Sequence, residues 1–126
     1  MLEMKRNQEY TISIPVKVSA ETLYNILWGA IHQGSQYWLY EIYDATDKPT
    51  FIQDILISDK TFYAVPLDDM DRRHPFTLAD IIIGLQKYCS KYGDCIEDGN
   101  IDSCKIDSPS CDLILQYAIW GEQVYG

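Results

Sequence analysis

The spacing of hydrophobic residues changes between neighbouring segments, and this change most constrains the fold. Residues 10–18 carry apolar side chains at every second position: Tyr10, Ile12, Ile14, Val16 and Val18. A period of two predicts a half-buried β-strand. Because Pro15 has no backbone N–H, the strand is expected at a sheet edge or with Pro15 on its unpaired side.

Three later segments have helical spacing instead. The first follows a capping Ser19 and ends at Gly34. The second begins at Thr77, with Asp80 at capping-box spacing, and ends at Gly93. The third begins with Ser108 and Pro109 and is apolar over most of its circumference. Such a helix is expected to lie in the centre of the core or under a partner.

Segments 37–43, 51–57 and 61–65 are rich in β-favouring residues, and the last two predict a hairpin. Segments 66–76 and 94–107 are polar and predict loops, with a tight turn at 98–99. The expected order is β-α-β-β-β-α-α. This order indicates a single α+β domain over residues 1–126, with an antiparallel or mixed sheet of about four strands packed with three helices.

Composition limits the partners. The 126 residues carry a net charge of −9, which argues against binding a nucleic-acid backbone. An acidic surface favours solubility, a basic partner, or occupation of a basic groove meant for nucleic acid. No apolar run approaches the ~20 residues of a membrane-spanning helix, and the first residues lack the apolar core of a signal peptide. We therefore expect a cytoplasmic protein with reduced cysteines.

Local catalytic motifs are missing. There is no nucleophile elbow, phosphate-binding loop, dinucleotide fingerprint or zinc-protease motif. The acidic loop from Asp94 has calcium-ligand spacing in part, but Lys105 stands where a bidentate Glu is required. The four cysteines lack the close pairs of a structural zinc site, although they could still meet each other or a histidine in space. We expect no catalytic residues, no cofactor and no metal.

Candidate binding residues fall into three groups: one aromatic, one basic and one acidic. Aromatic side chains suit interfaces, and a basic cluster suits a carboxylate or phosphate. The candidates are Tyr37, Trp38, Tyr40 and Trp120, the basic Arg72, Arg73 and His74, and the acidic Asp94, Glu97, Asp98 and Asp102.

Two stretches, residues 30–38 and 106–126, are distinctive. They read Ala-Ile-His-Gln-Gly-Ser-Gln-Tyr-Trp and, near the C-terminus, Gln-Tyr-Ala-Ile-Trp-Gly-Glu-Gln-Val-Tyr-Gly. Together with the helical segment 78–88, they resemble a family of small, functionally uncharacterised proteins of bacteriophages and prophages. The resemblance implies a phage accessory protein made in a bacterial cytoplasm, a setting in which small acidic proteins often block a host system.

Our leading hypothesis is a phage-encoded, non-enzymatic binding protein that acts in counter-defence. It would inhibit a host defence protein such as a CRISPR effector, through an acidic patch over residues 94–107, or sequester a nucleotide signal with Arg72, Arg73, Trp38 and Tyr40. One alternative is a structural or assembly protein that forms a homo-oligomer through its last helix. The other is an unrecognised enzyme that uses Cys and His.

Overall fold

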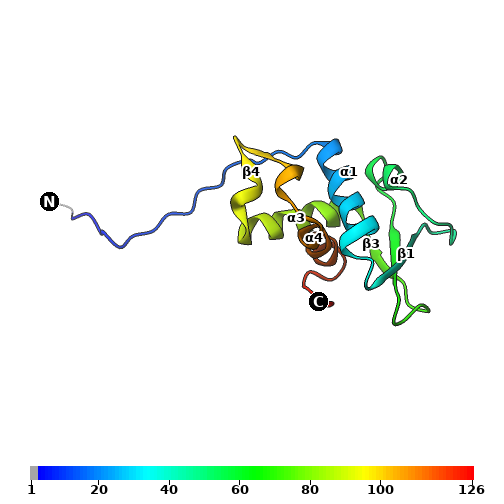
Figure 1. Cartoon of the computed structure of the whole chain (residues 1–126). Helices are drawn as coiled ribbons and strands as arrows, with labels where there is room; N and C mark the ends of the chain where they lie inside the picture. Colours follow the sequence, from blue (N-terminus) through cyan, green and yellow to red (C-terminus); the bar gives the residue numbers. More distant parts are fainter. Residues whose placement is uncertain (1–2) are drawn as a thin grey trace.

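The computed structural model describes residues 3–126 and combines helices with two small antiparallel sheets. The longer helices are α1 (Ala20–Gly29), continued by the π-helical turn η1 (Ala30–Gly34), α3 (Leu78–Lys91) and α4 (Ser108–Trp120). Figure 1 shows these helices gathered on one side of the larger sheet, with α4 between α1 and α3. The α+β class predicted from the sequence is confirmed, but the order and number of strands differ.

The helix starts follow the sequence signals. The Ser19 side chain accepts a hydrogen bond from the Thr22 N–H, and Thr77 and Asp80 form a reciprocal capping box. Asp107 caps α4, so the cap lies one residue before the predicted Ser108. Gly34 is needed for a different reason than a helix stop: a Cβ there would collide with the backbone carbonyl of Ser108. The three predicted helices are therefore confirmed.

The larger sheet has the strand order β1-β2-β3 (Leu39–Tyr43, Phe62–Pro66 and His74–Phe76). β3 lies within the segment predicted as a loop, and it accepts Pro75 because it is an edge strand. An irregularity between Leu39 and Glu41 shifts the register of β1. Tyr40 is consequently half-exposed while Ile42 is buried, although strict alternation would put them on one face.

Residues 51–57, predicted as a strand, instead form the short helix α2 (Ile52–Leu56). The reason is visible in the spacing of the apolar residues: Ile52, Ile55 and Leu56 repeat at three and four residues. Ile52 and Ile55 are both buried, and α2 packs against α1. Burial of this stripe outweighed the β-propensity of the segment.

Residues 10–18, predicted as the first strand, do not join a sheet. A single parallel bridge links Lys17 to Asn100, next to the hairpin of β4 (Ile96–Glu97) and β5 (Asn100–Ile101). The 3-10 turns Gly93–Cys95 and Ser103–Lys105 flank this hairpin, which occupies the segment predicted as an acidic loop. The turn predicted at residues 98–99 is confirmed, with both residues at positive φ.

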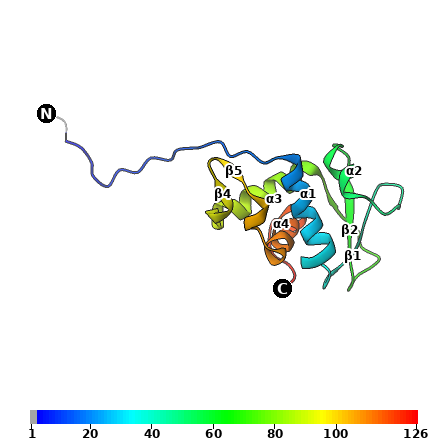
Figure 2. The ribbon, with the colours of Figure 1, turned by 45° about the horizontal axis from the view of Figure 1, so that its top comes forward.

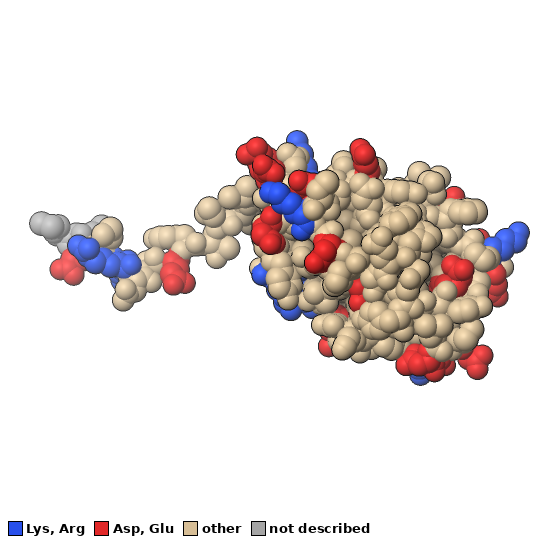
Figure 3. Space-filling view, in the orientation of Figure 1, with Lys and Arg blue, Asp and Glu red and all other residues tan. Residues whose placement is uncertain are grey.

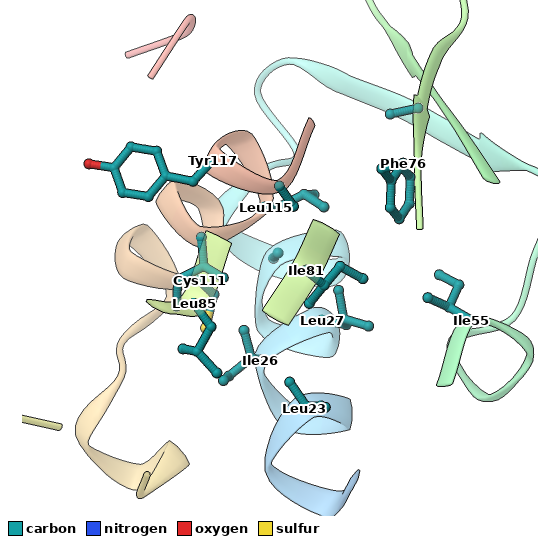
Figure 4. Packing of buried hydrophobic residues seen from close by; sticks show 14 of the residues in the cluster. Leu23, Ile26, Leu27, Ile55, Phe76, Ile81, Leu85, Cys111, Leu115 and Tyr117 are labelled. Carbon is teal, nitrogen blue, oxygen red and sulfur yellow. The ribbon is translucent and has the colours of Figure 1, made fainter. Parts of the chain in front are cut away.

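The core lies where α4 meets α1 and α3. Figure 4 shows Leu23, Ile26 and Leu27 of α1 facing Ile81 and Leu85 of α3 and Leu115 of α4, with Ile55 and Phe76 closing the side toward the sheet. Because its own chain covers α4 on several sides, the apolar circumference of that helix is explained by its central position. Among residues 3–126, no helix is both long and apolar enough to cross a membrane.

Candidate functional site

The N-terminal arm, residues 3–17, extends away from the body of the protein (Figures 1 and 2). Its apolar row stays in solvent, with Tyr10, Ile12, Ile14 and Val16 exposed by 85, 78, 71 and 41%. Within residues 3–126, no backbone hydrogen bond joins residues 9–16 to another segment. The arm therefore has the side-chain pattern of a half-buried strand without the sheet that would bury it.

An apolar groove begins where the arm meets the body. It has a volume of about 450 Å³ and lies between the arm, α3 and the β4–β5 hairpin. Ile14, Pro15 and Val16 form its arm side. The body contributes chiefly Ile82, Leu85, Cys89, Ile96 and Ile101. An apolar side chain from another segment could be buried in this groove.

Charge is distributed unevenly between the arm and the body. Residues 10–16 carry no charge, and the whole arm has a net charge of +1 from Lys5, Arg6 and Lys17 against Glu3 and Glu9. The remaining residues carry −10, since the whole chain carries −9. In Figure 3 the uncharged stretch separates the charged outer end of the arm from a body with many acidic side chains.

The aromatic residues predicted to bind a partner lie apart from the arm and the groove. Trp38 is only 2% exposed and stacks on Tyr125 with ring centroids 5.2 Å apart. It therefore belongs to the core, whereas the sequence analysis placed it among the candidate binding residues. Tyr37 and Tyr40 are half-exposed. Trp120 is partly buried, and its Nε1 donates to Nδ1 of His74 over 3.3 Å, so these two candidates contact each other.

A buried carboxylate that the sequence analysis missed organises this aromatic region. Asp112 accepts hydrogen bonds from Ser35 Oγ and Tyr37 Oη, each over 2.8 Å, and from Trp38 Nε1 over 2.6 Å. Gln116, four residues further along α4, donates a fourth over 3.1 Å. A carboxylate and an amide one turn apart in an otherwise apolar helix were the signal for this network.

Gln116 extends the network to the C-terminal tail. Its Oε1 accepts from the backbone N–H groups of Val124 and Tyr125, each over 2.8 Å, and its Nε2 donates to the Tyr125 carbonyl. Side chains from both stretches that carry the phage resemblance therefore meet here. Every polar atom named has a partner, and the site has the character of a structural lock that ties the tail to the segment between η1 and β1.

The tyrosines of this lock predict a loss of stability at high pH. Burial, together with the Asp112 carboxylate, raises the pKa of Tyr37 to about 12, and burial with Asp68 does the same for Tyr125. A raised pKa in the folded state contributes stability below the unfolded pKa of about 10, and this contribution is lost as the pH rises toward 12. Thermal unfolding between pH 8 and 12 should therefore show a steep fall in Tm above pH 10. The double variant Tyr37→Phe, Tyr125→Phe should fall less steeply, whereas Tyr10→Phe in the exposed arm should follow the wild type.

The basic candidates engage neighbouring acidic and aromatic side chains. Arg72 pairs with Asp69 at 3.6 Å, and Arg73 pairs with Asp47 at 3.2 Å while lying over the ring of Tyr43. The nearby Trp38 is buried. These residues therefore do not form a stacking pocket for a nucleotide with Trp38.

The acidic candidates surround the β4–β5 hairpin. Glu97 pairs with Lys105 at 3.0 Å, and Asp102 caps the following turn by accepting from the Cys104 N–H. Asp94 and Asp98 are exposed. Two of the four acidic candidates, Glu97 and Asp102, therefore already have partners within the chain. In the described residues 3–126, no group of three or more His, Cys, Asp or Glu side chains could hold a metal ion.

The environments of the cysteines are relevant to the alternative hypothesis of an enzyme that uses Cys and His. The Sγ atoms of Cys89 and Cys95 lie 3.5 Å apart, and burial raises the pKa of the Cys89 thiol to about 12 and that of Cys111 to about 11. Protonated thiols are weak nucleophiles. His32 packs on Trp28 and His74 on Trp120, and the hydrogen bonds that cysteine thiols make within residues 3–126 join none of them to a histidine.

A comparison with known protein families, curated proteins and solved structures finds no match for this chain. The arm, the groove and the uneven distribution of charge are the features of this structure that bear on its function.

Proposed function

We propose that this chain is a non-enzymatic binding protein that recognises a protein partner through its N-terminal arm. The observation that carries this proposal is the unpaired apolar row at Tyr10, Ile12, Ile14 and Val16. An extended segment of this kind binds by adding a strand to an exposed sheet edge or to a second strand. Main-chain hydrogen bonds then supply affinity, and alternate side chains supply specificity.

The mode of binding differs from those expected from the sequence. Stacking of a nucleotide on Trp38 loses its basis because that ring is buried. An acidic patch over residues 94–107 would have to use side chains of which Glu97 and Asp102 already have partners within the chain. Arm-mediated strand addition needs no rearrangement of the core, because residues 9–16 make no backbone hydrogen bond within residues 3–126.

The biological setting that we propose is counter-defence by a phage protein in a bacterial cytoplasm, where the partner is a host defence protein. This setting rests on the sequence resemblance of residues 30–38 and 106–126. The acidic body, with a net charge of −10 outside the arm, suits a partner with a basic surface beside the edge that receives the arm.

The test compares two single substitutions on opposite faces of the arm. Full-length protein carrying an affinity tag is incubated with bacterial extract, and the retained proteins are quantified by mass spectrometry. Ile12→Asp should reduce the retained partner at least about 10-fold, because a buried unpaired charge costs more than 1.4 kcal/mol. Thr11→Asp adds the same charge to the polar face and should retain the partner. An identical set of proteins retained by Ile12→Asp would refute arm-mediated binding.

A further inference from the structure

The two backbone edges of the arm are not equivalent. Lys17 directs both backbone groups toward the hairpin: its N–H donates to the Gly99 carbonyl over 2.8 Å, and its carbonyl accepts from the Ile101 N–H over 2.9 Å. In an extended strand, the backbone groups of alternate residues point to the same edge. Pro15 therefore faces the hairpin side, where its missing N–H interrupts the pairing. By the same alternation, Tyr10, Ile12, Ile14 and Val16 would direct their N–H and C=O groups to the opposite edge, and none of these four residues is a proline.

This open edge is complementary to itself. We propose that the arms of two copies of this chain pair antiparallel across a two-fold axis, with Ser13 opposite Ser13. The inference rests on the proposed function and adds a second copy of this chain to the partners of the arm, beside the host protein proposed above. A two-fold interface of this kind uses the same surface on both chains and closes after two copies.

Cross-strand neighbours select this register. With Ser13 on the axis, Ile12 lies opposite Ile14 of the second copy, and Tyr10 lies opposite Val16. Each of these residues would exchange both backbone hydrogen bonds with its neighbour. On the polar face, Glu9 lies opposite Lys17 of the second copy, so that opposite charges meet at both ends of the paired segment.

Other registers lose these matches. Moving the axis to Ile12 places Glu9 opposite Pro15, and moving it to Ile14 places Glu9 opposite Ser19. An axis between two residues would place the apolar row opposite the polar one. Only when the axis passes through Ser13 do opposite charges face each other and apolar residues pair along an edge without proline.

The apolar groove and the negative charge of the body are both compatible with this pairing. Ile14 and Val16 form one side of the apolar groove against α3, and the pairing brings Ile12 and Tyr10 of the second copy beside them. The second arm would thus cover a groove that is open in the single chain. Beyond the paired segment, Lys5 and Arg6 reach toward a second body that carries −10 outside its own arm.

Sedimentation equilibrium of the full-length protein tests the association. We expect a dimer at concentrations near 100 µM, and a dissociation constant raised at least about 10-fold by Ile12→Asp. Thr11→Asp, next along the chain but on the polar face, should sediment like the wild type. A wild-type protein that is monomeric at this concentration, or a dimer that Ile12→Asp leaves unchanged, overturns the inference.

Disulfide trapping tests the register. Opposed residues in a non-hydrogen-bonded antiparallel pair have Cα atoms about 4.5 Å apart, within the range that a disulfide spans. With the exposed Cys104 replaced by Ser, Ser13→Cys should give a covalent dimer when oxidised with oxidised glutathione. Thr11→Cys, which lies opposite Pro15, should give much less. Equal trapping at both positions overturns the register. If the full chain is monomeric but Ile12→Asp still loses another retained protein, the second copy is excluded while the proposed function stands.

Discussion

Replacing Asp112 by Ala is expected to lower the free energy of unfolding by about 3 kcal/mol or more, because several buried donors lose their acceptor together. Ser35, Trp38 and Gln116, which donate to this carboxylate, are all buried, and an unsatisfied buried group costs about 1–3 kcal/mol. Alanine also leaves a void beside the Trp38 ring. Urea denaturation followed by tryptophan fluorescence measures the loss.

Tyr37→Phe is the matched control for Asp112→Ala. It removes one donor, at a half-exposed side chain, and leaves the other three hydrogen bonds of Asp112 in place. The expected loss is about 1 kcal/mol. A loss below about 1 kcal/mol for Asp112→Ala itself would show that the carboxylate does not hold this network together.

Gly84→Ala is expected to destabilise the protein by at least about 2 kcal/mol, although alanine is the better helix former. α3 and α4 approach so closely at Gly84 that an added Cβ would lie 2.8 Å from both the Ala118 nitrogen and the Ile114 carbonyl oxygen. These are backbone atoms of α4, so the contact is relieved only by moving α3 away from α4. Thermal unfolding and urea denaturation report the change.

Gly93→Ala serves as the control for Gly84→Ala. Nothing lies within 4 Å of a Cβ added at Gly93. Its effect on stability should stay within about 0.5 kcal/mol. If Gly84→Ala were as stable as the wild type, the close packing of α3 on α4 would be wrong.

The aromatic region illustrates why site residues were hard to predict. The sequence shows that Tyr37, Trp38 and Trp120 are large and clustered, and such residues are common both in cores and at interfaces. Which of the two applies depends on Asp112, which lies 74 residues from Trp38 along the chain. Because that contact is set by packing of α4 against η1, local patterns could not assign the indole to the core.

Local sequence determined the starts of the helices and the conformations of tight turns. Ser19, Thr77 with Asp80, and the pair 98–99 act on backbone groups within a few residues, so their effects do not depend on the rest of the fold. Tertiary structure decided the secondary structure of segments whose apolar residues are spaced in a way that suits either a helix or a strand. Residues 51–57 became a helix because α1 offered a surface to Ile52 and Ile55.

The arm shows the same division most clearly. Alternation at residues 10–16 specified an extended segment with one apolar face, since that pattern depends only on side-chain order. Whether the segment joins a sheet depends on the edge of another strand with which it can pair. Of the arm residues that the structure describes, Lys17 alone pairs with such an edge, that of β5. Strand pairing is a contact between segments, so only the tertiary structure could reveal that the apolar face remains uncovered.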